Sequence, residues 1–190
     1  MTRVHVTLAC LVLILISASS DSFATQILFK SPEQLGSEST LVVRGTVESV
    51  RSYWNEERTT ILTETRIRID DTYKGVAGTT VAIVQYGGVV DHVKVSVAGA
   101  VSWQPEEEAL LYLEPFTSDT YQVTGFSQGK LNIVRGDRPG EIYVQAANLD
   151  GVELVGGPQT ATKAAGTKLT RLENYLDRSL GDARTRRAGQ

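Results

Sequence analysis

Hydrophobic and polar residues alternate along much of this chain with a period of two, which is the pattern of half-buried β-strands. The longest alternation covers residues 59–73, where Ile61, Ile67 and Ile69 share one side and charged residues such as Glu64 take the other. A strand of this length is typical of a curved barrel rather than of a flat sheet. The pattern therefore predicts a mainly β fold.

Shorter alternating or continuously apolar runs predict further strands. Gly45 interrupts the first of them and indicates a bulge or a sharp bend. The segments 121–126 and 130–134 are expected to pair with each other across Ser127-Gln128-Gly129. The remaining strands are expected at residues 40–50, 79–86, 89–97, 109–113 and 141–144. Together these runs predict a five- to six-stranded barrel.

Two helices are expected outside the barrel. The segment Ser31-Pro32-Glu33-Gln34 combines an N-cap hydroxyl, a proline at the first helical position and a glutamine at the third, which is a capping box for a short helix ending near Ser39. Four leucines at helical spacing predict an amphipathic helix over residues 167–181: Leu169, Leu172, Leu176 and Leu180. Residues 151–166 are expected to form a Gly-rich loop, and residues 182–190 a disordered tail.

The first 24 residues have the features of a secretory signal peptide. A basic start with Arg3 precedes an apolar run over residues 6–16, and the small-x-small ending Ser22-Phe23-Ala24 predicts cleavage before Thr25. An uncleaved membrane anchor is the alternative, but the run has only about half of the roughly 20 residues that a spanning helix needs. A lipoprotein is less expected because Cys10 lies inside the run. We therefore expect a secreted or periplasmic protein, with a barrel domain over residues 25–150 and no stable membrane insertion after cleavage.

Composition limits the kinds of catalysis and ligand binding that the chain can support. It has 190 residues, a net charge of −3, one cysteine and two histidines. The charge gives no reason to expect nucleic acid as a partner, and signal cleavage leaves His92 as the only imidazole and no thiol. Serine or cysteine catalysis through a histidine base and a His/Cys metal site are therefore not expected, and no phosphate-binding glycine loop is present. We expect a protein that is not an enzyme and has neither a cofactor nor a metal site.

The acidic stretch Glu106-Glu107-Glu108 is the one place where carboxylates gather. Glu106 and Glu108 would share one side of an extended segment, where repulsion raises a pKa or attracts calcium. The favoured interpretation is a charged segment that leads into a buried strand and limits aggregation. No catalytic or metal-binding role is assigned to it.

A binding surface is better supported by the sequence than a catalytic or metal site. The connection between the first two long strands contains Tyr53-Trp54-Asn55 and Arg58, and Arg66 and Arg68 lie on the adjoining outer face. Large aromatic side chains are favoured as interface anchors, so these six residues are the candidate binding site. The alternative for Tyr53 and Trp54 is packing over one end of the barrel. Trp103 has the same two interpretations.

Four short motifs in a fixed order carry a resemblance to a known class of domains. After the short helix come Leu-Val-Val-Arg-Gly-Thr-Val at 41–47, Asp-Thr-Tyr-Lys-Gly at 71–75, Thr-Val at 80–81 and Glu-Glu-Ala-Leu-Leu-Tyr-Leu at 107–113. This order resembles netrin-like domains and tissue inhibitors of metalloproteinases, and above all exported bacterial proteins of that layout whose activity is uncharacterised. The resemblance covers about residues 31–134. It implies a five-stranded Greek-key OB-fold barrel that binds ligands on one face and through two loops.

The chain lacks the residue through which the inhibitors of this class act on a protease. Those inhibitors begin with a cysteine whose amino group and carbonyl grip the catalytic zinc of the protease, and disulfides hold that cysteine in place. The chain that starts at Thr25 has no cysteine. The resemblance therefore does not carry this inhibitory mechanism over.

Two hypotheses about function follow. The first is a secreted non-catalytic binding domain for a protein, peptide or glycan, with an extracellular protease among the candidate ligands. The second is a structural or envelope-associated domain that docks to another exported protein through an exposed strand edge. Single-stranded nucleic acid, a ligand of other OB folds, is disfavoured by the negative net charge and the export signal.

Overall fold

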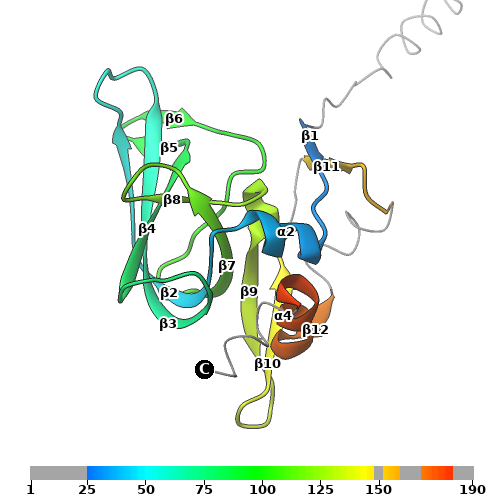
Figure 1. Cartoon of the computed structure of the whole chain (residues 1–190). Coiled ribbons are helices and arrows are strands. Elements are labelled where there is room, and N and C mark those ends of the chain that lie inside the picture. The colour runs from blue at the N-terminus through cyan, green and yellow to red at the C-terminus, as the bar shows by residue number, and fades with distance from the viewer. Residues whose placement is uncertain (1–24, 148–151, 159–167, 182–190) are drawn as a thin grey trace, which may run out of the picture.

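The computed structural model describes residues 25–147, 152–158 and 168–181, and over these residues the fold is mainly β (Figure 1). The predicted signal peptide, the tail after Gly181 and most of the predicted Gly-rich loop lie outside the described residues. The helices are α2 (Pro32–Glu38), the 3-10 helix η1 (Phe126–Gly129) and α4 (Leu172–Leu180). The strands are β1 (Thr25–Leu28), β2 (Leu41–Trp54), β3 (Ile61–Lys74), β4 (Thr80–Tyr86), β5 (Gly88–Val90), β6 (Val93–Val95), β7 (Glu108–Pro115), β8 (Tyr121–Val123), β9 (Lys130–Arg135), β10 (Ile142–Ala146), β11 (Val152–Val155) and β12 (Leu169–Arg171).

Five strands close into a ring. Their order is β7-β2-β3-β4-β8, and β8 pairs back to β7. On the other side the same sheet continues from β7 through β9 and β10 to β12, so that a flank leaves the ring. Figure 1 shows the ring on the left, with the flank and both α-helices on the right. The expected mainly β fold is confirmed, and the ring has five strands.

The long hairpin β2–β3 curves around the ring with the help of irregular pairing. The register between the two strands shifts at Arg44/Gly45, among other places. A Cβ atom at Gly45 would lie 2.4 Å from the backbone oxygen of Arg68, which no side chain allows. The bulge predicted at Gly45 is therefore confirmed, and close approach of β3 is its physical reason.

Two hydrophobic cores lie on opposite faces of β7. Ala109, Leu111 and Leu113 point into the ring, whereas Leu110 and Tyr112 point toward the helices, and all five are fully buried. The ring core also contains Leu41, Val43, Val47, Ile67, Val81, Ile83, Val101, Trp103 and Val123. The outer core contains Leu35, Val42, Leu131, Val144, Leu172, Leu176 and Leu180. The continuous apolar run of β7 is thus explained by burial on both of its faces.

Helices α2 and α4 cover the outer core and touch each other closely. The side chain of Ser31 accepts a hydrogen bond from the Gln34 amide, and the Gln34 side chain accepts one from the Ser31 amide, which confirms the capping box. A Cβ atom at Gly36 would lie 1.7 Å from the carbonyl oxygen of Ser179 in α4. The Ser179 hydroxyl in turn shares a hydrogen bond of 2.5 Å with the buried Tyr112 hydroxyl. Gly36 therefore lets the two helices meet backbone to backbone.

The predicted pairing of residues 121–126 with 130–134 is wrong. Both β8 and β9 pair with β7, β8 at Leu113–Pro115 and β9 at Ala109–Leu111, so they follow one another along the same edge of that strand. Gly125 and Phe126, with φ angles of 69° and 59°, turn the chain between them. This turn lets β8 reach β4 and close the ring while β9 enters the flank.

Three further boundaries differ from the sequence-based expectation. In place of the single strand predicted at 89–97, β5 and β6 form a small hairpin, because Asp91 takes a left-handed φ of 52° and reverses the chain next to the exposed His92. Within the predicted loop 151–166, Val152–Val155 form β11, which pairs in parallel with β1. The C-terminal helix begins at Leu172 instead of 167, because the preceding residues, 169–171, pair with β10. No helix in the described part of the chain is long and apolar enough to cross a membrane.

The contact at Gly36 gives a test of the helix packing. Replacing Gly36 with Ala places a methyl group against the Ser179 carbonyl, so α4 must shift and the free energy of unfolding should fall by about 1–3 kcal/mol. Chemical denaturation measures this loss. The matched control is Gly78→Ala, where the nearest atom to an added Cβ lies at 4.0 Å, and its free energy of unfolding should stay nearly unchanged. An equal effect of both substitutions would contradict the close helix contact.

Candidate functional site

The aromatic pair of the predicted binding loop belongs to a strand. Tyr53 and Trp54 are the last two residues of β2, where they pair with Leu62 and Ile61 and are half-buried. Arg51 lies over the Tyr53 ring, with its guanidinium carbon 5.4 Å from the ring centre. The expectation that both aromatics lie in a loop is therefore wrong, because strand pairing extends to the very end of β2.

The polar members of the predicted site are engaged with their neighbours. Asn55 accepts hydrogen bonds from the amides of Thr59 and Thr60 at 2.8 and 3.0 Å, so its side chain builds the turn. Arg58 lies in the same turn with a φ of 55°. On β3 each arginine faces a carboxylate of its own strand: Arg66 pairs with Glu64 at 3.1 Å, and Arg68 pairs with Asp70 at 2.8 Å. The six predicted residues form a hairpin tip and a charge-balanced face.

The acidic stretch before β7 holds ion pairs. Glu107 accepts a hydrogen bond of 2.7 Å from the ammonium of Lys130, which lies 5.1 Å from the ring centre of Trp103 and is only 4% exposed. Burial lowers the pKa of Lys130, and the Glu107 carboxylate opposes that shift. Glu108 pairs with Arg44 and Arg135. These carboxylates therefore balance cations, and Trp103 packs into the ring core.

A pocket of about 290 Å³ lies where the ring is least complete. Its walls come from six separate segments of the chain: the end of β1, the end of β4, the segment 97–101, the end of β7, β8 and the turn before η1. The lining residues are Ile27, Leu28, Lys30, Val84, Gln85, Tyr86, Val97, Ala100, Val101, Glu114, Gln122, Val123, Gly125 and Phe126. Most of this surface is apolar, and none of the six predicted binding residues contributes to it.

Large apolar side chains are unusually exposed around this pocket. Leu28 is 61% exposed, Tyr86 53%, Phe126 50% and Val97 37%, and all four line the pocket. Scattered apolar side chains on a surface are ordinary, but several gathered on one concave surface mark a place where another molecule binds. This pocket is therefore the candidate functional site.

Phe126 adds backbone strain to the same place. Its φ of 59° lies in the left-handed region, which costs a residue with a side chain roughly 1–2 kcal/mol. Half of the Phe126 surface stays in solvent, so the ring buries only part of its apolar area against this cost. Residues in such strained conformations are concentrated at functional sites.

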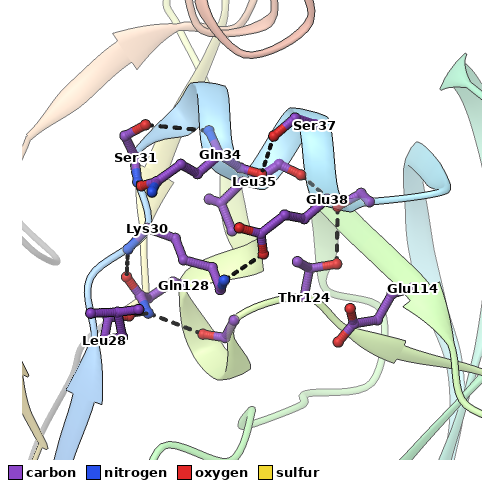
Figure 2. A network of polar contacts seen from close by, with 12 residues as sticks. Leu28, Lys30, Ser31, Gln34, Leu35, Ser37, Glu38, Glu114, Thr124 and Gln128 are labelled. Atoms are coloured by element: carbon purple, nitrogen blue, oxygen red, sulfur yellow. Dashed lines mark hydrogen bonds and ion pairs between the residues drawn. The ribbon is translucent and has the colours of Figure 1, made fainter.

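Polar contacts fix the β1 side of the pocket (Figure 2). The Gln128 side chain accepts a hydrogen bond of 2.9 Å from the Lys30 amide and donates one of 3.0 Å to the Leu28 carbonyl. It also donates to the carbonyl of Gly125 at 3.2 Å. The ammonium of Lys30 pairs with Glu38 of α2. One glutamine thus ties the chain after β1 to the turn that carries Phe126.

The seam between β4 and β8 forms another wall. These two strands share a single residue pair, Ile83 with Tyr121, and then separate. The Gln85 side chain forms a bridge from β4 to the segment 97–101, since it donates to the Val101 carbonyl at 2.8 Å and accepts from the Val101 amide at 3.2 Å. The pocket opens beside this bridge.

Sequence reasoning missed this pocket because its residues come from distant segments. The apolar run Ile27-Leu28-Phe29, close after the predicted cleavage site, was the nearest signal, since such a run favours a strand there. Tyr86 and Phe126 read as the last residues of the predicted strands 79–86 and 121–126. Only the ring closure brings them together.

Comparison with known proteins gives no further assignment: neither the family models nor the curated proteins that were searched match this sequence.

Substitution of Phe126 tests whether the strain serves a site. Phe126→Gly removes the left-handed penalty of roughly 1–2 kcal/mol, but it also loses the buried half of the ring, worth about 2.5 kcal/mol, and adds the backbone entropy of glycine, so the free energy of unfolding should fall by only about 1–2 kcal/mol. Chemical denaturation of the full chain measures it. Phe126→Asn is the matched control, because asparagine tolerates the same φ but keeps a Cβ atom. A loss of more than about 3 kcal/mol in both variants would mean that Phe126 is kept for packing.

Proposed function

We propose that this protein is an exported, non-catalytic binding domain that holds a segment of another polypeptide in the pocket lined by Leu28, Tyr86, Val97 and Phe126. The observation that carries the proposal is the exposure of these four large apolar side chains around one hollow. Aromatic and aliphatic anchors that fill such hollows supply most of the energy of protein interfaces.

The strand order supports an OB-type barrel as the scaffold. In chain order the ring strands are β2, β3, β4, β7 and β8, and the fourth of them, β7, returns to lie beside the first. This order supports a Greek key, in which three hairpin-connected strands are followed by one that pairs back. A five-stranded Greek-key barrel is a common scaffold for ligand sites, so it favours a binding role without defining the ligand.

The chemistry of the pocket favours a polypeptide over a glycan or a nucleic acid. A glycan presents many hydroxyl groups, and most of this wall offers them no polar partner. A nucleic acid needs uncompensated cations, whereas the lining residue Lys30 is paired with Glu38. A side chain of leucine or phenylalanine size suits the apolar wall.

The alternative of docking through a strand edge finds less support at the end of the sheet. The outermost strand of the flank, β12, has three residues and pairs with β10. Its Lys168 neighbour and its own Arg171 bring charge to that edge, which is a common protection against edge pairing. We therefore propose that the partner binds at the pocket rather than at the edge of β12.

Selection of peptides tests the proposal. The full chain is immobilised and panned with a phage-displayed library of random heptapeptides, and the selected sequences are synthesised and titrated by fluorescence anisotropy. We expect selected peptides to share a large apolar residue. Leu28→Ser and Phe126→Gly should each weaken binding by about tenfold or more, as the loss of an interface anchor does.

The matched control is Leu169→Ser, because Leu169 is 48% exposed but lies outside the pocket. Its dissociation constant should equal that of the unchanged chain. Failure to select any peptide, or equal weakening by Leu169→Ser, would exclude the pocket as a polypeptide site. Circular dichroism of each variant confirms that the β fold is intact.

A further inference from the structure

We propose that the bound segment adds to β4 as an extended strand, beyond the point where β8 leaves it, and carries a basic residue that pairs with Glu114. This inference rests on the proposed function and specifies how the polypeptide is held. It predicts a ligand with three features: an extended backbone, an apolar side chain for the pocket and a cation at the rim.

The edge of β4 is open where the pocket begins. Its pairing with β8 ends after Ile83 and Tyr121, although β4 itself continues through Val84, Gln85 and Tyr86. On its other side β4 stays paired with β3 as far as Tyr86. One edge of three residues is thus held flat by β3, and no strand of the described residues lies on its opposite side.

The alternation of the ladder shows which backbone groups face this open edge. Flanking hydrogen bonds run from the Gly87 amide to the Ile61 carbonyl and from the Ile69 amide to the Thr79 carbonyl. In an antiparallel pair every second residue bonds to the partner strand, so Ile83 and Gln85 turn toward β3. Val84 and Tyr86 therefore turn their backbone groups toward the seam.

Three of these groups lie past the β4–β8 pair: the carbonyl of Val84 and both the amide and the carbonyl of Tyr86. No backbone hydrogen bond found outside the ladders of the described residues uses them. They form an acceptor, a donor and a second acceptor along one edge. An extended polypeptide backbone presents the complementary groups with the same spacing, which is the basis of strand addition.

Strand addition also directs a side chain of the ligand into the pocket. The side chains of Val84 and Tyr86 lie on the same face of β4, and both line the pocket. A strand added beside them directs every second side chain to that face. One such side chain then enters the hollow between Leu28, Val97 and Phe126.

Glu114 supplies a charge that this ligand complements. It lines the pocket, accepts a hydrogen bond of 3.0 Å from Gln122 and has no cationic partner within 4.0 Å among the residues that the structure describes. The other charged residue of the lining, Lys30, is already paired with Glu38. The net charge at the rim is therefore negative, and a lysine or arginine beside the apolar anchor is the complementary feature.

Backbone methylation separates strand addition from other binding modes. A heptapeptide selected on the full chain is synthesised with a single N-methyl group at each position in turn, which removes one amide donor at a time. We expect affinity to fall about tenfold or more at alternate positions and to change little at the positions between them. The unmethylated peptide and the methylated positions between serve as internal controls.

Charge exchange tests the role of Glu114. The basic residue of the peptide is replaced by glutamine, and both peptides are titrated against the full chain, Glu114→Gln and the control Glu56→Gln, whose carboxylate is exposed in the β2–β3 turn. The unchanged chain and Glu56→Gln should prefer the basic peptide by about three- to tenfold. Glu114→Gln should lose that preference.

The outcomes distinguish the two proposals. Peptides that bind and respond to Phe126→Gly, but show no alternation in the methylation series, would overturn strand addition and leave the pocket as a polypeptide site. A charge preference that persists in Glu114→Gln would overturn the role of Glu114. Selection of no peptide at all would overturn both the proposed function and this inference.

Discussion

Burial of β7 on both faces is the constraint on which the rest of the fold depends. Ala109 and Leu111 face the ring core, whereas Leu110 and Tyr112 face the helices, and each is fully buried. A strand with two apolar faces requires a packed layer on each side. The ring therefore cannot stand alone: the same strand that closes it also requires α2, α4 and the flank of β9 and β10.

The candidate site results from the way in which β8 and β9 share one edge of β7. Since β8 takes one half of this edge and β9 the other, the chain must turn between them, and it does so at Gly125 and Phe126. The short β8 then reaches β4 through only one residue pair. The incomplete closure leaves the open edge of β4, and the turn places an exposed aromatic side chain beside it. The closure of the ring and the pocket therefore both result from the turn between β8 and β9.

The sequence predicted what depends on local patterns. The alternation of Ile61 and Ile67, the bulge at Gly45 and the capping box of Ser31 each involve neighbours in the chain, so their chemistry can be read directly. Pairing of β8 with β9 was expected because adjacent strands usually form hairpins, and competition for the edge of β7 overrode that tendency. The pocket draws on six segments, from Leu28 to Phe126, and no local pattern encodes such a set.

The physical cost of the site supports its selection for something other than folding. Phe126 holds a left-handed φ and exposes half of its surface, although glycine would take this φ freely. The hydrogen bonds of the Gln128 side chain, in turn, fix Leu28 and the Phe126 turn relative to each other. A rigid frame around exposed apolar side chains gives folding little benefit. It does benefit binding, because a preformed site loses less conformational entropy when its ligand arrives.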